Sequence, residues 1–448
     1  MAAQRTLLKG GTVLSLDPGV GNLKQGDVLI EGSTIAAVGP NLEAADAEVI
    51  DASNTIVMPG FIDTHRHMWE GILRNIGADV PLEGDGGYLA VILNVLAPHF
   101  RPEDAHIGDL LAAYGCIDAG ITTILDWSHI QATSEHADAV IEALQQSGIR
   151  AVFAYGYPWW KAPEPDQDDW LRRVASQYFS SKDQLLTLGC APPGPEFTPF
   201  DMARAQWTVA REVDARITVH VGVGTFGQHG KLGEMARAGL LGPDTTYIHC
   251  TTLNDDEIQA IVDTGGTFSL ASPVEMMMGH GMPPTQRFLS RGVRPSLSVD
   301  VETNVPNDMF TQMRSAVSFQ HALAFEQRLA GKTDAPEPVG SRDVLEWATV
   351  EGARANGLED KVGTLTPGKQ ADVIVLRTDR INVMPVNDPI GAVVWGMDTS
   401  NVDSVFVAGR AMKRGGRLLN VDLNRLRTLA EDSRDYVVSK SGFTPPRI

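Results

Sequence analysis

The sequence predicts an α/β fold: a (β/α)8 TIM barrel together with a composite β-sandwich domain that both chain ends form. Two patterns and the chain length predict it. Strand-like and helix-like segments alternate through the middle of the chain, and short strands with Gly, Asp and Pro turns fill both ends. The 448 residues suffice for a barrel of about 250 residues and a smaller second domain.

Residues 1–58 are predicted to form the first part of the β-sandwich. TLLKGGTVLSLD, GDVLIEGSTIAAVG and AEVIDASNTIVMPG alternate branched apolar residues with Gly, Asp and Ser. This alternation is typical of short, half-buried strands joined by tight turns.

The barrel is predicted over residues 59–364. In SEHADAVIEALQQSGIRAVFAYG a helical pattern runs through a glycine into an apolar strand. The same order recurs in AQWTVAREVDARITVHVGVG and in DDEIQAIVDTGGTFSLA. Repeated strand and helix units favour a parallel sheet, and their number suits a closed barrel.

Residues 365–448 are predicted to complete the β-sandwich and to end in a helix and a tail. VGTLTPGKQADVIVLR and VDSVFVAGRAM return to the short-strand pattern of the N-terminal segment. Because both ends share this pattern, we expect them to join one domain.

The composition excludes several functional classes. The formal net charge of −19 disfavours nucleic acid and anionic membrane surfaces as partners. Three widely spaced cysteines give neither a disulfide framework nor a CxxC pair, which indicates a reducing compartment. The N-terminal MAAQRTLLKGG lacks the apolar region of a signal peptide, and no segment has the roughly 18 apolar residues of a membrane span. We therefore expect a cytoplasmic protein that acts on a small molecule.

PGFIDTHRHMW carries the strongest local motif. His65 and His67 follow an apolar strand and are two residues apart, so in extended backbone they share one face. Two imidazoles on one face can bind the same metal ion. Read alone, the pair could equally be surface or core histidines.

Three further metal-compatible residues end later strands. His220 closes ITVH, His249 closes TYIH and Asp300 closes LSVD. A single one of them could be a satisfied buried polar group. Because active sites of TIM barrels lie at the carboxyl ends of the strands, their recurrence in one chain predicts a shared metal site.

The chain resembles the amidohydrolase superfamily, in particular its cytosine-deaminase-like and triazine-hydrolase-like branch. The resemblance rests on VIDASNTIVMPGFIDTHRH before the barrel, AGITTILD within it and VGTLTPGKQADVIVL after it. It implies one divalent metal ion, zinc or alternatively iron, held by His65, His67, His220 and Asp300. It also implies that Asp300 transfers protons and that His249 orients the water or polarises the substrate. Family members often form homo-oligomers, so we expect one here.

Two positions depart from that branch. Deaminases of the branch carry HxxE where this chain has HVGV, so Val223 replaces a proton-donating Glu. Pro193 likewise stands where a substrate-contacting His is usual. Glu302 is a candidate replacement acid, although it could also be a solvated loop carboxylate.

Three substrate-binding residues are predicted: Glu302, Asn304 and Trp69, the last as a pocket wall beside the HxH motif. His280, in EMMMGHGMPP, reads either as a pocket-lining or as a surface residue.

The predicted function is hydrolysis by metal-activated water of a C–N bond in a small molecule, with an amide, cyclic amide, urea or amino-heterocycle as substrate. Val223 argues against ring deamination. The alternatives are a dehalogenating hydrolase of an N-heterocycle and a metal-dependent lyase or isomerase, such as a decarboxylase, on the same barrel. The last alternative is a non-catalytic binding protein.

Overall fold

The computed structural model describes residues 5–161 and 166–444. The chain divides into two compact units, one of residues 1–63, 115–123 and 308–420, the other of 64–114, 124–307 and 421–448. These bounds differ from the predicted domains, because the helices after residue 308 group with the first unit. The predicted C-terminal helix is α13 (Leu423–Ser441), which groups with the second. The last four residues of the predicted tail lie outside the described residues.

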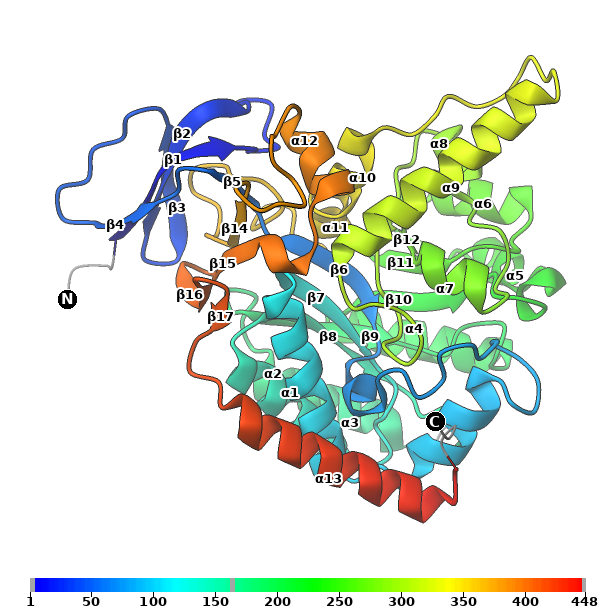
Figure 1. The fold of residues 1–448 in the computed structure, drawn as a ribbon. Helices are drawn as coiled ribbons and strands as arrows, with labels where there is room; N and C mark the ends of the chain where they lie inside the picture. The colour runs from blue at the N-terminus through cyan, green and yellow to red at the C-terminus, as the bar shows by residue number, and fades with distance from the viewer. Residues whose placement is uncertain (1–4, 162–165, 445–448) are drawn as a thin grey trace. The chain divides into compact units, whose positions relative to one another are not determined.

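Within the described residues of the first unit, nine strands from both chain ends form one mixed sheet. β5 (Thr55–Pro59) pairs antiparallel with β14 (Val373–Arg377) and so joins the N-terminal strands to the C-terminal ones (Figure 1). Branched apolar residues of both ends, such as Val28 and Val375, pack into one core cluster. The predicted composite domain is therefore confirmed. The other strands are β1 (Arg5–Val13), β2 (Leu23–Glu31), β3 (Thr34–Gly39), β4 (Glu48–Asp51), β15 (Val402–Val407), β16 (Arg410–Arg414) and β17 (Arg417–Leu418).

Eight strands of the described chain form the barrel sheet, and neighbours in the sheet follow one another along the chain. Its two edges meet where Arg66 of the first strand bridges in parallel to Asp300, just after the last strand. The predicted (β/α)8 barrel is confirmed. The strands are β6 (Phe61–Arg66), β7 (Ile121–Ser128), β8 (Arg150–Gly156), β9 (Leu186–Ala191), β10 (Arg216–Val221), β11 (Thr245–His249), β12 (Thr267–Leu270) and β13 (Ser296–Leu297).

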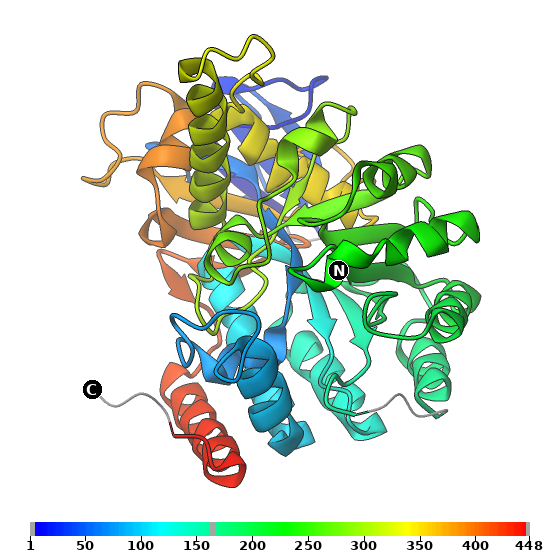
Figure 2. The same cartoon turned by 90° about the vertical axis from the view of Figure 1, so that its right-hand side faces the viewer.

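Helices cover the outside of this sheet (Figure 2). β7 and β8 are buried at every residue, as expected of barrel strands enclosed on both faces. Asn254 illustrates how a sequence signal starts a helix: its side chain accepts a hydrogen bond from the Glu257 backbone, and the Glu257 carboxylate accepts one from the Asn254 backbone. The covering helices are α2 (Ser134–Ser147), α3 (Asp166–Tyr178), α4 (Phe200–Glu212), α5 (Lys231–Arg237) and α6 (Asp255–Asp263).

Shorter helical segments of the second unit follow individual barrel strands: η1 (Met68–Leu73), η2 (Leu89–Leu96), η3 (Ala97–His99), η4 (Phe226–His229), α7 (Ser272–Met277) and α8 (Thr285–Leu289). α13 packs Leu426 against Leu110 of α1 (Pro102–Asp118) and Ala143 of α2. The helices after the barrel are α9 (Met309–Leu329), α10 (Ser341–Trp347), α11 (Val350–Ala355), α12 (Pro389–Gly391), η5 (Ala392–Gly396) and η6 (Thr399–Asn401). A search of the described helices for one that could span a bilayer finds none.

Candidate active site

The four predicted metal ligands meet at the carboxyl end of the barrel. The ligand atoms of His65, His67, His220 and Asp300 all lie within 4.8 Å of one another. The His65 Nε2 atom is 3.0 Å from Asp300 Oδ1 and 3.1 Å from His220 Nε2, and His67 Nε2 is 3.4 Å from Asp300 Oδ1. Strands β6 and β10 and the segment just after β13 thus bring side chains 235 positions apart into contact.

The environment of the three imidazoles favours their neutral form, which can bind a metal ion through a nitrogen lone pair. Burial and the neighbouring histidines hold the pKa of His65 and of His220 well below the ordinary value. Burial also lowers the pKa of His67, whose Nδ1–H donates to the Trp127 carbonyl oxygen at 2.9 Å. That hydrogen bond fixes the tautomer and leaves the Nε2 lone pair facing Asp300.

The donor set fits a divalent ion. A tetrahedral zinc ion with ligand distances of about 2.0–2.2 Å holds neighbouring ligand atoms about 3.3–3.6 Å apart. The separations of 3.0–3.4 Å are close to this spacing. Three neutral imidazoles and one carboxylate are ligand types that zinc and iron both accept.

Backbone strain marks the same strand ends. His249 and Asp300 adopt φ angles of 68° and 72°, in the left-handed region that residues with a Cβ rarely occupy. Asp300 N–H donates to the His65 carbonyl oxygen at 2.9 Å, and His67 N–H donates to the Asp300 carbonyl oxygen at 2.9 Å. These bonds between the two edges of the sheet stabilise the strained residue in place.

His249 lies beside the four ligands and has a buried acidic partner. Its Nδ1 is 3.2 Å from the Glu275 carboxylate and its Nε2 is 3.6 Å from Asp300 Oδ2. Burial lowers the pKa of His249, but the hydrogen bond to Glu275 and the Asp300 charge outweigh it, so the net pKa is raised. Glu275 therefore directs the Nε2 side of the ring toward Asp300.

Comparison with known proteins agrees with this geometry. The profile of the amidohydrolase family matches residues 56–412. The chain belongs to the amidohydrolase family. The prediction of an amidohydrolase-type enzyme is thereby confirmed.

Three proteins similar to this amidohydrolase differ in the reaction that their names describe. A 5'-deoxyadenosine deaminase of Methanothermobacter thermautotrophicus is 28% identical over 454 residues, which cover 96% of this chain and 98% of that protein. The structure of an adenosine deaminase from Xanthomonas campestris with bound zinc has a TM-score of 0.83 at 21% identity and covers 97% of this chain and 98% of its own. An atrazine chlorohydrolase from Arthrobacter aurescens, complexed with zinc, has a TM-score of 0.81 at 22% identity, with coverage of 96% and 100%. The two structural matches show a shared fold.

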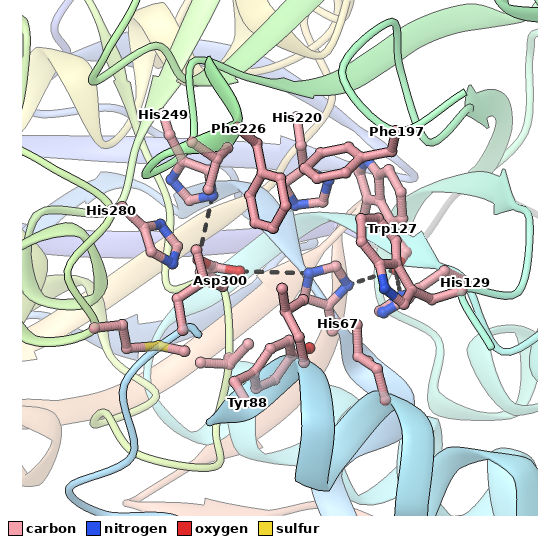
Figure 3. Close-up of a pocket in the computed structure, with 17 residues that line it drawn as sticks. His67, Tyr88, Trp127, His129, Phe197, His220, Phe226, His249, His280 and Asp300 are labelled. Atoms are coloured by element: carbon pink, nitrogen blue, oxygen red, sulfur yellow. Dashed lines mark hydrogen bonds and ion pairs between the residues drawn. The ribbon is translucent and has the colours of Figure 1, made fainter. Parts of the chain in front are cut away.

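A cavity of about 530 Å³, counting its opening to solvent, lies over the metal ligands (Figure 3). Asp300 is the one acidic residue among the described lining residues, and no Lys or Arg is among them. Apolar and aromatic side chains form most of the wall: Leu82, Leu89, Leu93, Trp127, Trp159, Phe197, Val223, Phe226, Met278 and Val301.

Trp69 is not among the described residues that line the cavity. Its side chain is fully buried, and its Nε1–H donates to His129 Nδ1 at 3.4 Å. His129 does line the cavity, with its ring centroid 4.3 Å from that of His67. Trp69 thus supports a wall residue rather than forming the wall itself.

Glu302 is also directed away from the cavity. Its Oε1 accepts a hydrogen bond from Arg66 at 2.5 Å and its Oε2 accepts one from Arg74, which occupies both oxygens. Burial raises the pKa of Glu302, but the two guanidinium groups outweigh it and the net pKa is lowered. This ion-pair cluster anchors the HxH segment and leaves Glu302 ill-suited to donate a proton. Asn304 lies two residues further on and is not among the described lining residues either.

Sequence reasoning missed one polar pair at the cavity. Tyr88 lines the cavity, and its hydroxyl donates to the buried carboxyl group of Glu70. Burial raises the pKa of both groups well above their ordinary values. The two residues lie 18 positions apart in a segment without regular periodicity, so no pattern in the sequence could have paired them.

The positions that depart from the deaminase pattern have different surroundings. Val223 lines the cavity and presents a methyl-bearing wall at the end of β10, whereas Pro193 is buried and is not among the described lining residues. Next to Val223, Gly222 N–H donates a hydrogen bond to Glu196 Oε1 at 2.6 Å.

Proposed function

We propose that this chain is a metal-dependent hydrolase that cleaves the bond between a ring carbon and an exocyclic nitrogen in a neutral, largely apolar N-heterocycle. The observation that carries the proposal is the position of three neutral imidazoles and Asp300 beneath an aromatic cavity. The relatives, a 5'-deoxyadenosine deaminase among them, make ring deamination the leading reaction.

His65, His67, His220 and Asp300 would hold the ion, which we take to be zinc because the related structures contain it. When bound there, a divalent ion would lower the pKa of water from 15.7 to about 7 and so would supply a nucleophile at neutral pH.

We assign the proton transfers to Asp300. Its carboxylate takes one proton from the attacking water as the C–O bond forms and delivers it to the leaving nitrogen as the C–N bond breaks. His249 Nε2, 3.6 Å from Asp300 Oδ2, is close enough to orient the attacking oxygen. Glu275 supports this role because its carboxylate fixes the orientation of the His249 ring.

The lining limits the substrate class. Because no Lys or Arg is among the described lining residues, the cavity has no guanidinium or ammonium group to pair with a phosphate or carboxylate of a substrate. The ring centroids of Trp159 and Phe197 lie 4.5 Å apart, and those of Phe197 and Phe226 lie 5.0 Å apart, so three aromatic rings, tilted against one another, form one cluster in the wall. Such a wall favours a planar ring with an apolar substituent.

Dehalogenation of an N-heterocycle is the second candidate, and Val223 favours it. A halide leaves without a proton, so a wall that lacks an acid at the end of β10 suits this leaving group. The atrazine chlorohydrolase relative shows that the fold accommodates such a reaction.

A product screen tests the proposal. Enzyme with its metal content verified is offered 5'-deoxyadenosine, adenosine, cytosine and atrazine, and released ammonia and chloride are measured in ¹⁸O-labelled water. We expect ammonia from at least one amino-substituted ring and one labelled oxygen in the product. Chloride alone would favour the second candidate. Failure of the metal-loaded enzyme to convert any of the four, or a product without label, would overturn hydrolysis of N-heterocycles.

A cytoplasmic location is part of the proposal. Cys116, Cys190 and Cys250 are buried and form no disulfide, which suits a reducing compartment. The net charge of −19 agrees with a partner that is a small neutral molecule. We keep the homo-oligomer as a proposal that rests on family resemblance.

A further inference from the structure

One imidazole in the cavity has no role in the scheme above. His280 lies on the loop between α7 and α8, lines the cavity and is 4% exposed. Neither of its ring nitrogens has a hydrogen-bond partner among the described residues. Figure 3 shows the ring directed at Asp300 and the space above the metal ligands. Because a buried polar group without a partner is unfavourable, a ring in this position is arranged for a ligand.

The loop holds His280 in this position through its backbone. The His280 carbonyl oxygen accepts hydrogen bonds from Gly224 N–H at 2.8 Å and from Thr251 Oγ1 at 2.6 Å. Gly279 and Gly281 flank it with φ angles of 79° and 125°, and a Cβ on Gly281 would lie 3.0 Å from the Thr251 Cβ. Both positive φ angles favour glycine, and at Gly281 the absence of a Cβ also permits the close approach of the loop to Thr251.

Three other polar side chains that line the cavity each have a hydrogen-bond partner within the protein. The Tyr88 hydroxyl donates to Glu70, Trp127 Nε1–H donates to the Thr218 carbonyl oxygen, and His129 Nδ1 accepts from Trp69. Val223 and Val301 offer no polar atom in their side chains. Both ring nitrogens of His280 lack such a partner among the described residues, so this lining residue has a donor and an acceptor to offer a substrate.

The His280 ring lies beside the two residues that we propose to act on the substrate, His249 and Asp300. The His280 ring centroid is 4.6 Å from that of His249, and one of its nitrogens lies within 4.8 Å of an Asp300 oxygen. A heterocycle whose electrophilic carbon lies near Asp300 would therefore have the neighbouring ring atom within reach of His280.

Building on the proposed function, we propose that His280 donates a hydrogen bond to the ring nitrogen next to the carbon that water attacks. As the C–O bond forms, the C=N electron pair moves onto this nitrogen, and an N–H donor stabilises the charge that develops there. A neutral imidazole can do so without changing its protonation state. No proton is transferred from His280 in this step.

His249, His280 and Asp300 could instead bind a second cation, since their ligand atoms also lie within 4.8 Å of one another. We favour the substrate contact because Asp300 would be the one carboxylate shared by two divalent ions. The acidic group behind them, Glu275, is engaged by His249.

Kinetics and metal analysis together test the proposal. His280→Leu removes the donor, His280→Gln keeps an N–H donor, and His229→Leu makes the same chemical change at an exposed site on η4. With 5'-deoxyadenosine as substrate, we expect kcat of His280→Leu to fall about 100- to 1,000-fold. His280→Gln should recover part of the rate, and His229→Leu should equal the wild type. All four proteins should hold the same metal content; loss of a second equivalent in His280→Leu would replace the proposal by the second-cation site.

Binding provides a readout without turnover. The probes are 6,9-dimethylpurine, which has no leaving group, and its analogue in which C–H replaces ring nitrogen 1. We expect the wild type to bind the purine about 10-fold more tightly and His280→Leu to bind both alike. Equal affinity of the wild-type enzyme for the two probes would overturn the role of His280. A wild-type kcat in His280→Leu would overturn it too. An inactive wild type would instead count against the proposed function.

Discussion

Three structural features meet at Asp300. Its carboxylate lies 3.0 Å from His65 and 3.6 Å from His249, its backbone closes the barrel against Arg66, and its φ of 72° is strained. The strain is tolerated because backbone hydrogen bonds to His65 and His67, at the opposite edge of the sheet, hold the residue in place. The same contacts leave the carboxylate facing the cavity.

Replacement of Asp300 by Asn should therefore abolish turnover. An amide cannot accept the water proton, and general base catalysis contributes about 100- to 10,000-fold. We expect kcat to fall by at least about 100-fold and the metal content to decrease as well. Asp255→Asn, an exposed control on α6, should be neutral. Steady-state rates and metal analysis of both proteins decide the matter, and a near-native rate for Asp300→Asn would contradict the mechanism.

The loop between β9 and α4 positions the end of β10. Glu196 in this loop accepts a hydrogen bond from Gly222 N–H, one residue before Val223 of the cavity wall. Burial raises the pKa of Glu196 from 4.5 to about 7, against the opposing effect of the backbone hydrogen bonds. The folded protein therefore keeps a proton on Glu196 in a pH range where the unfolded chain has lost it.

The stability due to Glu196 should consequently depend on pH. The contribution of the bound proton is complete below pH 4.5 and is lost as the pH rises through about 7. Relative to Glu196→Gln, the wild type should lose free energy of unfolding between pH 5 and 8, by at most about 3 kcal/mol at roughly 1.4 kcal/mol per pKa unit. Urea unfolding at several pH values measures this difference. Exposed Glu326→Gln should give a curve parallel to that of the wild type, and a parallel curve for Glu196→Gln would refute the expectation.

At the scale of the whole molecule, the proposed metal ligands come from both edges of the barrel sheet. His65 and His67 belong to the first strand and its end, and Asp300 follows the last strand. An ion bound by all of them would stabilise the closed sheet, because a ligand that binds only the folded state adds about 2.7 kcal/mol at 100 times its Kd.

Removal of metal by a chelator should therefore lower the melting temperature, and added zinc should restore it. His65→Ala loses a ligand, so its melting temperature should respond to neither treatment. Thermal unfolding followed by fluorescence, with and without chelator, measures both proteins. Identical melting curves for the treated and untreated wild type would contradict the link between metal and stability.

Several features could be predicted from the sequence because their physical causes are local. Alternating patterns predicted both the barrel and the two-ended sheet, and the proposed metal ligands lie in apolar strands or within three residues of their ends. In a parallel barrel the carboxyl ends of all strands meet at one face, so a His or Asp at a strand end points to the site before any contact is known.

Other features depended on the tertiary structure. Trp69 and Glu302 lie within five residues of strand ends, yet the Trp69 indole donates to His129, and the Glu302 carboxylate pairs with Arg66 and Arg74. His280 reads equally well as a surface residue until its loop is seen bonded to Gly224 and Thr251. The local pattern determines which residues reach the carboxyl end of the barrel. Which of them face the cavity is decided by burial and by charged partners far apart in the sequence, because those contacts form only once the sheet has closed.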